Sequence, residues 1–330
     1  MRRFAALALA VLSLGACTAP TTTPPPTADL GLRPVTAVPT RPPTPTVPLR
    51  PSPRAPTPTP SPTAALPPYR ASAGAFVRVA GDALQLNGER FTVRGLTLSR
   101  ELWATDALAV LEADFARLQQ MGANTVRLPL RSAALFADGA PIPAGFARLD
   151  AVLRLAGAYD LRVIPVLFAD AAPDVLPDAE LLAVLARRYR DEPALLLWDV
   201  RDVDTATLYA RVSRDEALSW LARTSAVLRA ADPVHPLTAS WRGDAAGTLA
   251  TADVVSVQLS GSVNDLRRQV AALRQWGAKP LLLGAMGGAE GETLRAAVLA
   301  AEGDRLAGWL LDATDTPADP FETLDALLNP

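Results

Sequence analysis

The sequence predicts one (β/α)8 barrel behind a long unstructured N-terminal segment, and three observations support this fold class. Residues 74–330 have nearly the length of such a barrel, about 250 residues. Within them, short apolar runs of strand length alternate with amphipathic runs of helix length. Eight such units with short connections favour a parallel sheet that closes on itself. The chain has 32 basic and 34 acidic residues, spread along its length, so the composition predicts no nucleic-acid partner.

Residues 1–17 have the pattern of an export signal. Two arginines precede the apolar run 4–14, which is shorter than the roughly 20 residues of a membrane-spanning helix. The run leads into Leu-Gly-Ala-Cys, which resembles a bacterial lipobox and implies that Cys17 is lipidated. We therefore expect an extracytoplasmic protein, lipid-anchored to the bacterial cell membrane or outer membrane. An ordinary signal peptide and an apolar cytosolic start are the alternatives.

Residues 18–73 form a Pro- and Thr-rich segment, and 18 of the 31 prolines of the chain lie between residues 19 and 68. Proline removes backbone donors and fixes φ, so the segment is expected to be a disordered tether. At about 3.1 Å per residue, fifty residues would reach on the order of 150 Å. Binding of a proline-recognition module and O-glycosylation remain alternatives. The predicted domains are therefore 1–17, 18–73 and 74–330.

The counts of cysteine and histidine limit the chemistry of the barrel. Cys17 is the single cysteine, which excludes disulfides, thiolate metal sites and a cysteine nucleophile from residues 74–330. His235, the single histidine, lies in the turn DPVHP, where we expect a structural role. No glycine-rich stretch matches a nucleotide-binding fingerprint. We expect neither a metal nor a cofactor.

The elements follow in order from a β-hairpin. Residues 76–93 alternate apolar and polar side chains, and Asn87-Gly88 predicts a type I′ turn. The eight strands are expected at 91–98, 125–128, 161–168, 194–200, 237–240, 254–259, 280–283 and 306–311. The helices are expected at 107–121, 146–159, 179–189, 215–229, 264–276 and 293–301. Expected helix caps are Ser213 or Asp215, Asn264, Gly122 and Gly277.

The stretch RYRDEPALLLWDVRDVD, residues 188–204, reads as a helix end, a turn, a buried strand and a charged strand exit. It resembles the fourth strand of glycoside hydrolase family 5, whose members are retaining (β/α)8-barrel enzymes of the cellulase and endo-β-mannanase type. KPLLLGAMGG at 279–288 resembles the seventh strand of that family. NTVRLPL at 124–130 and DPVHP at 232–236 extend the resemblance along the barrel. It implies a carbohydrate site at the carboxyl ends of the strands.

The sequence departs from the family at both catalytic positions. The resemblance places the general acid/base at Val203 and the nucleophile at Ala285. A valine cannot transfer a proton, and an alanine cannot form a glycosyl ester, so the family mechanism fails at both steps. Gln258 stands where the family often has a histidine. These three changes favour a catalytically inactive barrel.

Other residues could supply part of a site. Asp202, where the family has an asparagine, and Asp312 on the eighth strand are the candidate substitute acids; they require a remodelled backbone, because neighbouring strand residues face opposite sides. Arg127 matches the family arginine that supports the nucleophile; it either contacts ligand or pairs with Asp199 or Asp202. Tryptophans near strand ends suit stacking on sugar rings, with core packing as the alternative. The expected ligand-binding residues are Arg127, Trp103, Asp202, Trp241, Gln258 and Trp309.

Three functions are therefore considered. The first is a surface-anchored, catalytically inactive barrel that binds a polysaccharide or oligosaccharide at its mouth. The second is an active glycoside hydrolase that cleaves a β-linked polysaccharide with relocated carboxylates. The third is a structural scaffold of the cell envelope. In each case we expect a monomer that contacts the membrane through the lipid on Cys17.

Overall fold

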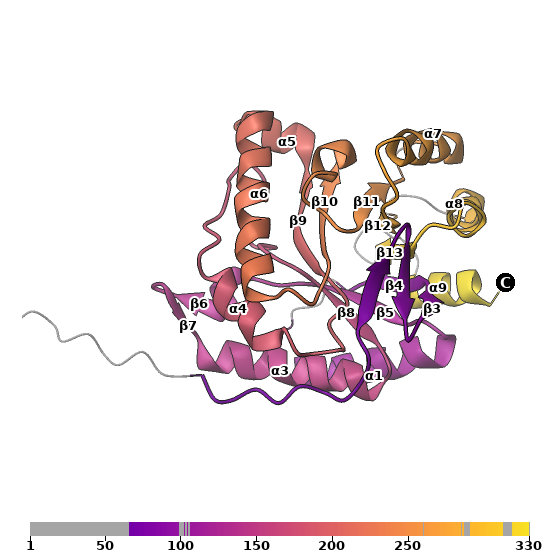
Figure 1. Cartoon of the computed structure of the whole chain (residues 1–330). Coiled ribbons are helices and arrows are strands. Elements are labelled where there is room, and N and C mark those ends of the chain that lie inside the picture. The colour runs from indigo at the N-terminus through magenta and orange to yellow at the C-terminus, as the bar shows by residue number, and fades with distance from the viewer. Residues whose placement is uncertain are drawn as a thin grey trace, which may run out of the picture. The chain divides into compact units, whose positions relative to one another are not determined.

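Eight parallel strands form the centre of the protein, shown here as a computed structural model. The described residues are 66–98, 102, 104, 106–259, 261–284, 286, 291–312 and 319–329. The strands are β4 Val93–Thr97, β5 Thr125–Pro129, β8 Arg162–Val166, β9 Trp198–Asp204, β10 Leu237–Arg242, β11 Val255–Gln258, β12 Leu281–Gly284 and β13 Gly308–Asp312. They lie in the order β10, β9, β8, β5, β4, β13, β12, β11 (Figure 1).

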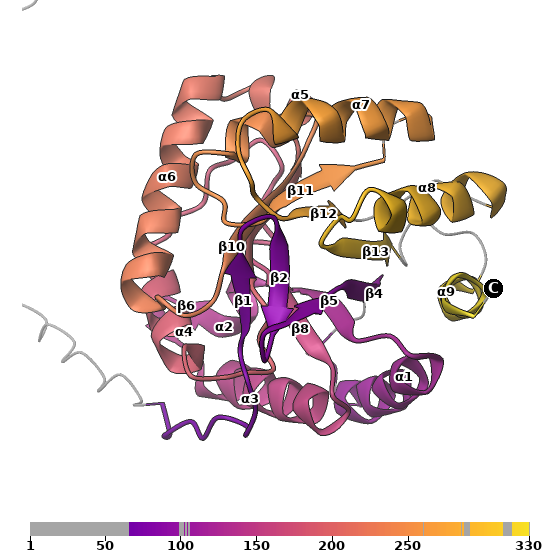
Figure 2. The same ribbon diagram turned by 45° about the vertical axis from the view of Figure 1, so that its right-hand side comes forward.

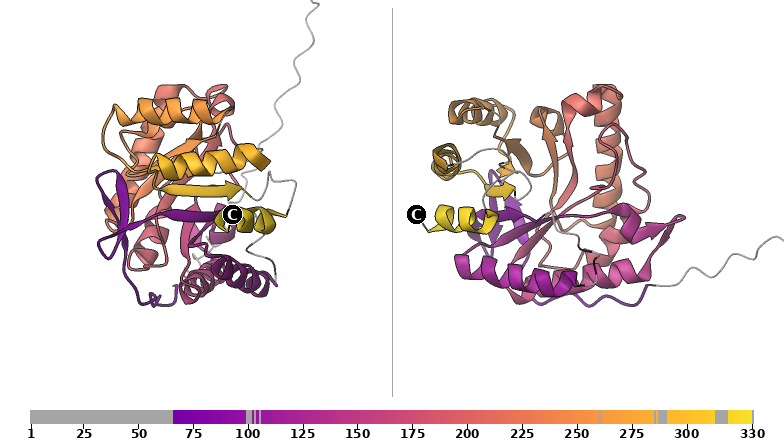
Figure 3. Two further views of the ribbon diagram at one scale, coloured as in Figure 1. Left: turned by 90° about the vertical axis from the view of Figure 1, so that its right-hand side faces the viewer. Right: turned by 180° about the vertical axis from the view of Figure 1, so that it is seen from behind.

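The two edge strands of this sheet, β10 and β11, approach each other and nearly close it into a barrel. The backbone N–H groups of Asp253 and Val254 donate to the carbonyl of Leu237 at 2.8 and 3.1 Å. The hydroxyl oxygens of Ser240 on β10 and Ser256 on β11 lie 3.2 Å apart. Helices surround the strands (Figure 3). They are α1 Ala107–Met121, α3 Pro143–Ala158, α4 Leu182–Tyr189, α6 Arg214–Ala231, α7 Val263–Arg274, α8 Gly291–Gly303 and α9 Pro320–Leu328. The predicted (β/α)8 fold class is confirmed.

The helices bury one apolar face against the sheet. In α1, Leu111, Phe115 and Leu118 recur at helical spacing and have no exposed surface. Gly122 then ends the helix with φ 84°, as predicted, because glycine adopts a left-handed conformation without steric cost. Ser213 accepts a hydrogen bond from the Glu216 N–H and caps α6, which was also predicted.

An antiparallel sheet closes the amino ends of the barrel strands. It consists of β1 Val77–Ala80, β2 Ala83–Leu86 and β3 Glu89–Phe91, and it lies across the barrel in Figure 2. Asn87 and Gly88 both have positive φ, 55° and 85°, as the predicted type I′ turn requires. Val77 and Leu84 pack with Ile164 from the barrel strands in one buried cluster. The lumen of the barrel is therefore apolar near the amino ends of the strands. The polar side chains that face the lumen lie nearer the carboxyl ends.

Some predicted boundaries were wrong. The first barrel strand is β4, and Phe91, predicted to begin it, belongs to the hairpin instead. The cap of α7 is Ser262, not Asn264, because Ser262 and Asp265 form a reciprocal capping box. Gly277 has φ 142° but lies three residues beyond the end of α7 at Arg274. Short elements that the sequence analysis did not predict are α2 Ser132–Leu135, β6 Phe136–Ala137, β7 Ala140–Pro141, α5 Thr205–Tyr209 and η1 Ala245–Thr248, together with α9.

The largest correction concerns the fourth barrel strand. The apolar run 194–200 predicted a strand, whereas β9 begins at Trp198 and continues to Asp204. Leu196 and Leu197 instead pack into the apolar lower lumen with the hairpin. Pairing with β10 shifts by one residue between Thr238 and Ser240, which is a β-bulge. The charged residues predicted to follow this strand are therefore part of it.

The described chain begins before the predicted barrel boundary. Residues 66–73, expected in the tether, lie against α3 and α4, and Leu66 and Tyr69 join the main apolar cluster. None of the described helices is both long enough and apolar enough to cross a membrane.

Candidate functional site at the carboxyl ends of the strands

A buried ion pair lies inside the barrel, above its apolar floor. Arg127 on β5 pairs in register with Ile164, whose side chain faces the lumen, so Arg127 also points inward. Its guanidinium donates to the Asp199 carboxylate on β9 at 2.7 and 3.2 Å, and Asp202 accepts a further bond at 2.9 Å. Burial alone would lower the pKa of Arg127, but the two carboxylates outweigh it and raise this pKa above its usual value.

Asp202 connects this buried pair to the solvent. Its second carboxylate oxygen accepts a charge-assisted hydrogen bond from Arg242 at the end of β10. The side chain of Asp202 is 18% exposed and that of Arg242 is 46% exposed. The four groups Arg127, Asp199, Asp202 and Arg242 carry two positive and two negative charges, so they neutralise one another. The Asp202 carboxylate is held between two guanidinium groups.

Polar side chains on β10 and β11 continue this network. The Ser240 hydroxyl on β10 donates to Asp199 at 2.7 Å, and its oxygen lies 3.2 Å from that of Ser256 on β11. The Gln258 amide, two residues on, lies 3.5 Å from the same Ser256 hydroxyl. Gly284 on β12 leaves room for them, because a Cβ there would lie 2.5 Å from the Ser256 hydroxyl oxygen. The lining is therefore polar on β5, β9, β10 and β11.

Two threonine hydroxyls add unused hydrogen-bonding capacity. Thr97, the last residue of β4, pairs in register with Arg127 on one side and Asp312 on the other. All three therefore share the lumen face. The hydroxyls of Thr97 and Thr238 are buried, and neither has a hydrogen-bond partner within the part of the chain that the structure describes. A buried hydroxyl without a hydrogen-bond partner destabilises the folded state. These two hydroxyls are therefore suited to bind water or a ligand hydroxyl.

Val203 lies among apolar side chains. It is 2% exposed, belongs to the main apolar cluster and pairs in register with Trp241. The next residue, Asp204, caps α5: its carboxylate accepts hydrogen bonds from the Thr207 hydroxyl and backbone N–H, which lower the pKa of Asp204. Asp204 is thus occupied as a helix cap. Ala285, where the resemblance placed the nucleophile, lies outside the described residues.

The prediction that Trp241 and Trp309 stack on a ligand needs correction. Both side chains are 0% exposed. Trp309 pairs in register with Arg94, whose side chain reaches outward to Glu302 of α8 at 3.0 Å, so Trp309 faces the helices. Trp241 packs edge-on against Tyr209 of α5. These tryptophans bury apolar surface between sheet and helices. Trp103 lies outside the described residues.

The segment between β8 and α4 forms a fixed rim beside the network. Arg201 on β9 is 2% exposed, and its guanidinium donates to the backbone carbonyls of Ala172, Pro173 and Val175 at 2.5–3.3 Å. The Trp220 indole N–H donates to the Pro177 carbonyl at 2.7 Å. Desolvation lowers the pKa of Arg201. Because a buried cation is held by these carbonyls, the rim is anchored to the strand that carries Asp199 and Asp202.

The sequence analysis brought three residues of this network together but missed others. Arg127, Asp202 and Gln258 were predicted site residues, and all three belong to it. Arg242, Ser240 and Ser256 were missed because they lie outside the stretches that carry the resemblance. The signal available for Arg242 was its position two residues after the predicted fifth strand, 237–240, since such residues reach the mouth of a barrel.

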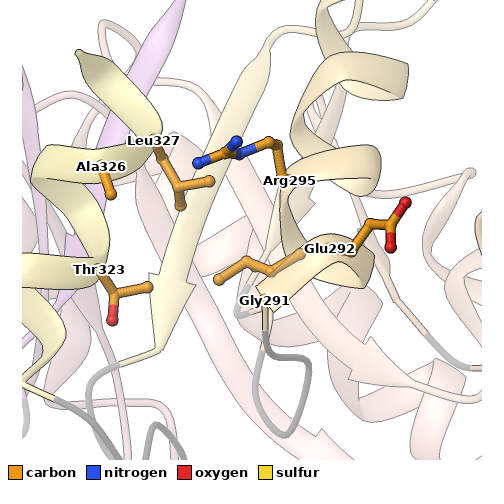
Figure 4. Close-up of a pocket in the computed structure, with 7 residues that line it drawn as sticks. Gly291, Glu292, Arg295, Thr323, Ala326 and Leu327 are labelled. Carbon is orange, nitrogen blue, oxygen red and sulfur yellow. The ribbon is translucent and has the colours of Figure 1, made fainter. Parts of the chain in front are cut away.

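Other described regions offer less chemistry. A hollow of about 630 Å³ lies on the outer wall between α8 and α9, where Arg295 reaches toward Leu327 and Glu292 points away (Figure 4). The rest of its lining is small or apolar, so we assign it no reaction. No three His, Cys, Asp or Glu side chains among the described residues could together hold a metal ion.

Comparison with known proteins identifies relatives in fold. No protein-family model and no curated protein matches the sequence. The structure is similar to the β-1,4-D-mannanase from Cryptopygus antarcticus, with a TM-score of 0.59 and 15% identity over 78% of this chain and 95% of that one. It is also similar to a β-glucanase from Saccharophagus degradans, with a TM-score of 0.58 and 14% identity over 79% and 96% of the two chains.

An endo-1,4-β-mannanase from Rhizomucor miehei gives a comparable result. Its TM-score is 0.57 at 15% identity, over 72% of this chain and 90% of that one. Each of these solved barrels is spanned almost completely, so the likeness covers the whole fold. The chain therefore has the (β/α)8 barrel of solved mannanases and glucanases, as the resemblance in the sequence implied.

Proposed function

We propose that the protein is a catalytically inactive, glycoside-hydrolase-like barrel that binds a polysaccharide or oligosaccharide at the carboxyl ends of its strands. The similar solved structures are a mannanase and a glucanase by name. The polar network occupies the end of the barrel where such folds place their ligands. Its charged, hydroxyl and amide groups offer the donors and acceptors that sugar hydroxyls need.

The observation that carries the inactive assignment is the state of Asp202. Retaining hydrolysis needs two carboxyl groups about 5 to 5.5 Å apart, one of them able to donate a proton. Asp202, the candidate substitute acid on this strand, is instead paired with Arg127 and Arg242. Its neighbour Val203 is buried hydrocarbon. This strand end therefore supplies hydrogen bonds to a ligand but no proton.

An active hydrolase is the second candidate, and the position of Asp312 favours it. Asp312 ends β13 on the lumen face, in register with Thr97. A mechanism with Asp312 and Asp202 would need Asp202 to leave at least one of its two arginines. Replacing Arg242 by a neutral residue distinguishes the two functions. In an active hydrolase it would release Asp202 for catalysis, whereas in an inactive binding protein it would weaken contacts with the ligand.

We also propose that the barrel is displayed outside the cytoplasm on a lipid-anchored tether. The support is the sequence alone, namely the lipobox resemblance at Cys17 and the proline-rich segment that follows. Metabolic labelling with a radioactive fatty acid should mark the wild-type chain and leave Cys17→Ser unlabelled. Label retained in the variant would refute the anchor.

Affinity electrophoresis in gels containing mannan, cellulose, xylan or peptidoglycan tests the binding function. The wild-type chain should be retarded by at least one polymer, and Arg242→Ala should lose most of that retardation. Arg229→Ala is the matched control: its side chain is 42% exposed and also pairs with one aspartate, but at the end of α6, near the amino ends of the strands. Equal mobility of wild type in all gels would favour the scaffold function.

A further inference from the structure

The segment 66–73 contacts the barrel in a way that its composition does not predict. It contains Leu66, Pro67, Pro68 and Tyr69 and looks like the end of the tether. In the structure it runs along α3, as the first indigo stretch in Figures 1 and 2 shows. Leu66 and Tyr69 pack against the main apolar cluster of the barrel.

A buried carboxylate on the barrel receives this segment. Glu192, in the turn before β9, has no exposed surface. Its carboxylate accepts hydrogen bonds from the Tyr69 hydroxyl at 2.5 Å, the Ser72 N–H at 2.9 Å and the Ala194 N–H at 2.9 Å. Two of these three donors come from residues 66–73. Burial, with the hydrogen bond to Glu192 and its charge, raises the pKa of the Tyr69 hydroxyl, so it remains a donor. Without the segment, a buried carboxylate would lose most of its partners, which is costly.

Aromatic and cationic contacts extend the same surface. The rings of Tyr69 and Tyr189 meet edge-on with centroids 4.9 Å apart. The Arg188 guanidinium donates to the Pro67 carbonyl at 2.8 Å and lies 5.4 Å from the Tyr69 ring centroid. Arg188 is fixed in turn by Asp150 of α3 at 2.6 Å. The receiving surface is therefore preorganised by contacts among barrel residues.

The direction of the segment follows from its partners. α3 follows β5, so it starts at the carboxyl ends of the strands and finishes at the amino ends. Pro67 and Tyr69 contact Arg188, and Arg188 pairs with Asp150, the eighth of the sixteen residues of α3. Ser72 lies beside Gly157, which is in the last turn of α3. Residue 66 is therefore on the mouth half of the barrel wall, and the chain reaches the opposite end only at β1.

We propose that residues 66–73 are a docked strap, and that the surface made by Tyr189, Glu192, Arg188 and α3 is its binding site. The tether then joins the barrel on the mouth half of its outer wall and not at the hairpin. Glu192, which receives the strap, is linked to β9: its backbone carbonyl lies 3.0 Å from the His235 ring, and His235 and Trp198 both contact Asp232. This inference does not depend on carbohydrate binding.

A double-mutant cycle in the full chain tests the key contact. Tyr69→Phe removes only the hydroxyl and should lower the Tm by about 2 to 4 °C, the shift expected for one lost hydrogen bond in a domain of this size. Glu192→Leu removes the acceptor, so adding Tyr69→Phe to it should have almost no further effect. Tyr159→Phe is the control, since its hydroxyl makes an exposed 3.4 Å contact to Glu112. Additive shifts from Tyr69→Phe and Glu192→Leu would overturn the proposed contact.

A cleavage experiment tests docking if Glu192→Leu fails to fold. A specific protease site is inserted between residues 73 and 74 of the full chain and cut after folding. The fragment 1–73 should co-elute with the barrel on gel filtration, or its release should lower the Tm of the barrel. The Tyr69→Phe chain should release the fragment faster. Release of 1–73 with an unchanged Tm would show that residues 66–73 are ordinary linker.

Discussion

The guanidinium of Arg127 lies 2.7 Å from the carboxylate of Asp199, and both side chains are at most 4% exposed. This pair is deep in the lumen, where each ion depends on the other for its solvation. From the sequence alone, the resemblance to family 5 matched Arg127 to an arginine expected to support a nucleophile. In this structure Arg127 pairs with two aspartates of β9. Its charge is therefore balanced without a carboxylate from the seventh strand.

Removing Arg127 alone should be strongly destabilising. Arg127→Met would leave Asp199 buried with only Ser240 as a partner and should lower the free energy of unfolding by about 3 to 5 kcal/mol. Arg127→Met combined with Asp199→Leu removes both charges and should recover much of this loss. Urea denaturation measures both variants. A loss below about 1 kcal/mol for the single variant would contradict a buried ion pair.

Placing a glutamate at position 203, where the resemblance puts the acid/base, should not produce catalysis. Val203 is 2% exposed and packs beside Trp241, so Val203→Glu would bury an unpaired carboxylate. We expect a drop of several kcal/mol in unfolding free energy, as for other uncompensated buried charges, and no release of reducing sugar. Val203→Thr, which keeps the shape, is the milder control. A stable Val203→Glu protein that cleaves mannan or glucan would show that this side chain faces the site.

The tryptophans provide a test of which side of the sheet binds ligand. Trp309→Phe and Trp241→Phe remove indole N–H groups that have no partner among the described residues, so no hydrogen bond is lost. Both variants should retain the carbohydrate affinity of the wild type in affinity electrophoresis, although the smaller rings leave cavities that lower stability. Loss of affinity with unchanged stability would place these rings at the ligand.

Acid sensitivity should arise in part from Asp232 at the amino-end side of the barrel. Burial would raise the pKa of Asp232, but hydrogen bonds from His235 and Trp198 and the charge of His235 lower it below its usual value of about 3.9. A lowered folded pKa contributes stability that is present above the unfolded pKa. It is lost as the pH falls below about 4 through the folded pKa. Asp232→Asn should flatten the fall of the Tm in this range; an unchanged profile would contradict the assignment.

The fold was predictable from the sequence because its signals are local. Helix α1 matched its predicted bounds because Leu111, Phe115 and Leu118 repeat at helical spacing and a glycine follows. The type I′ turn at Asn87-Gly88 was found for the same reason. The start of β9 was missed because the apolar residues 194–197 look like strand. Leu196 and Leu197 pack in the lumen at the amino end instead, and no local pattern distinguishes these two uses.

The site was only partly predictable, because its residues meet through tertiary pairing. Asp202 was singled out for replacing an asparagine, but its two arginine partners lie 75 and 40 residues away in the chain. Trp241 and Trp309 were assigned to the mouth by their nearness to strand ends. Their actual face depends on strand register, which one sequence does not reveal. Tyr69 and Glu192 are 123 residues apart, so composition alone assigned the strap to the linker.

Native mass spectrometry of the purified chain with manno-, cello- and xylo-oligosaccharides tests the central claim most directly, because one spectrum reports both the complex and the length of the bound sugar. The account predicts a complex that carries the intact oligosaccharide after prolonged incubation, and weaker occupancy for Arg242→Ala. Shortened sugars in the wild-type spectrum would contradict the inactive assignment, and the absence of any complex would contradict the binding function.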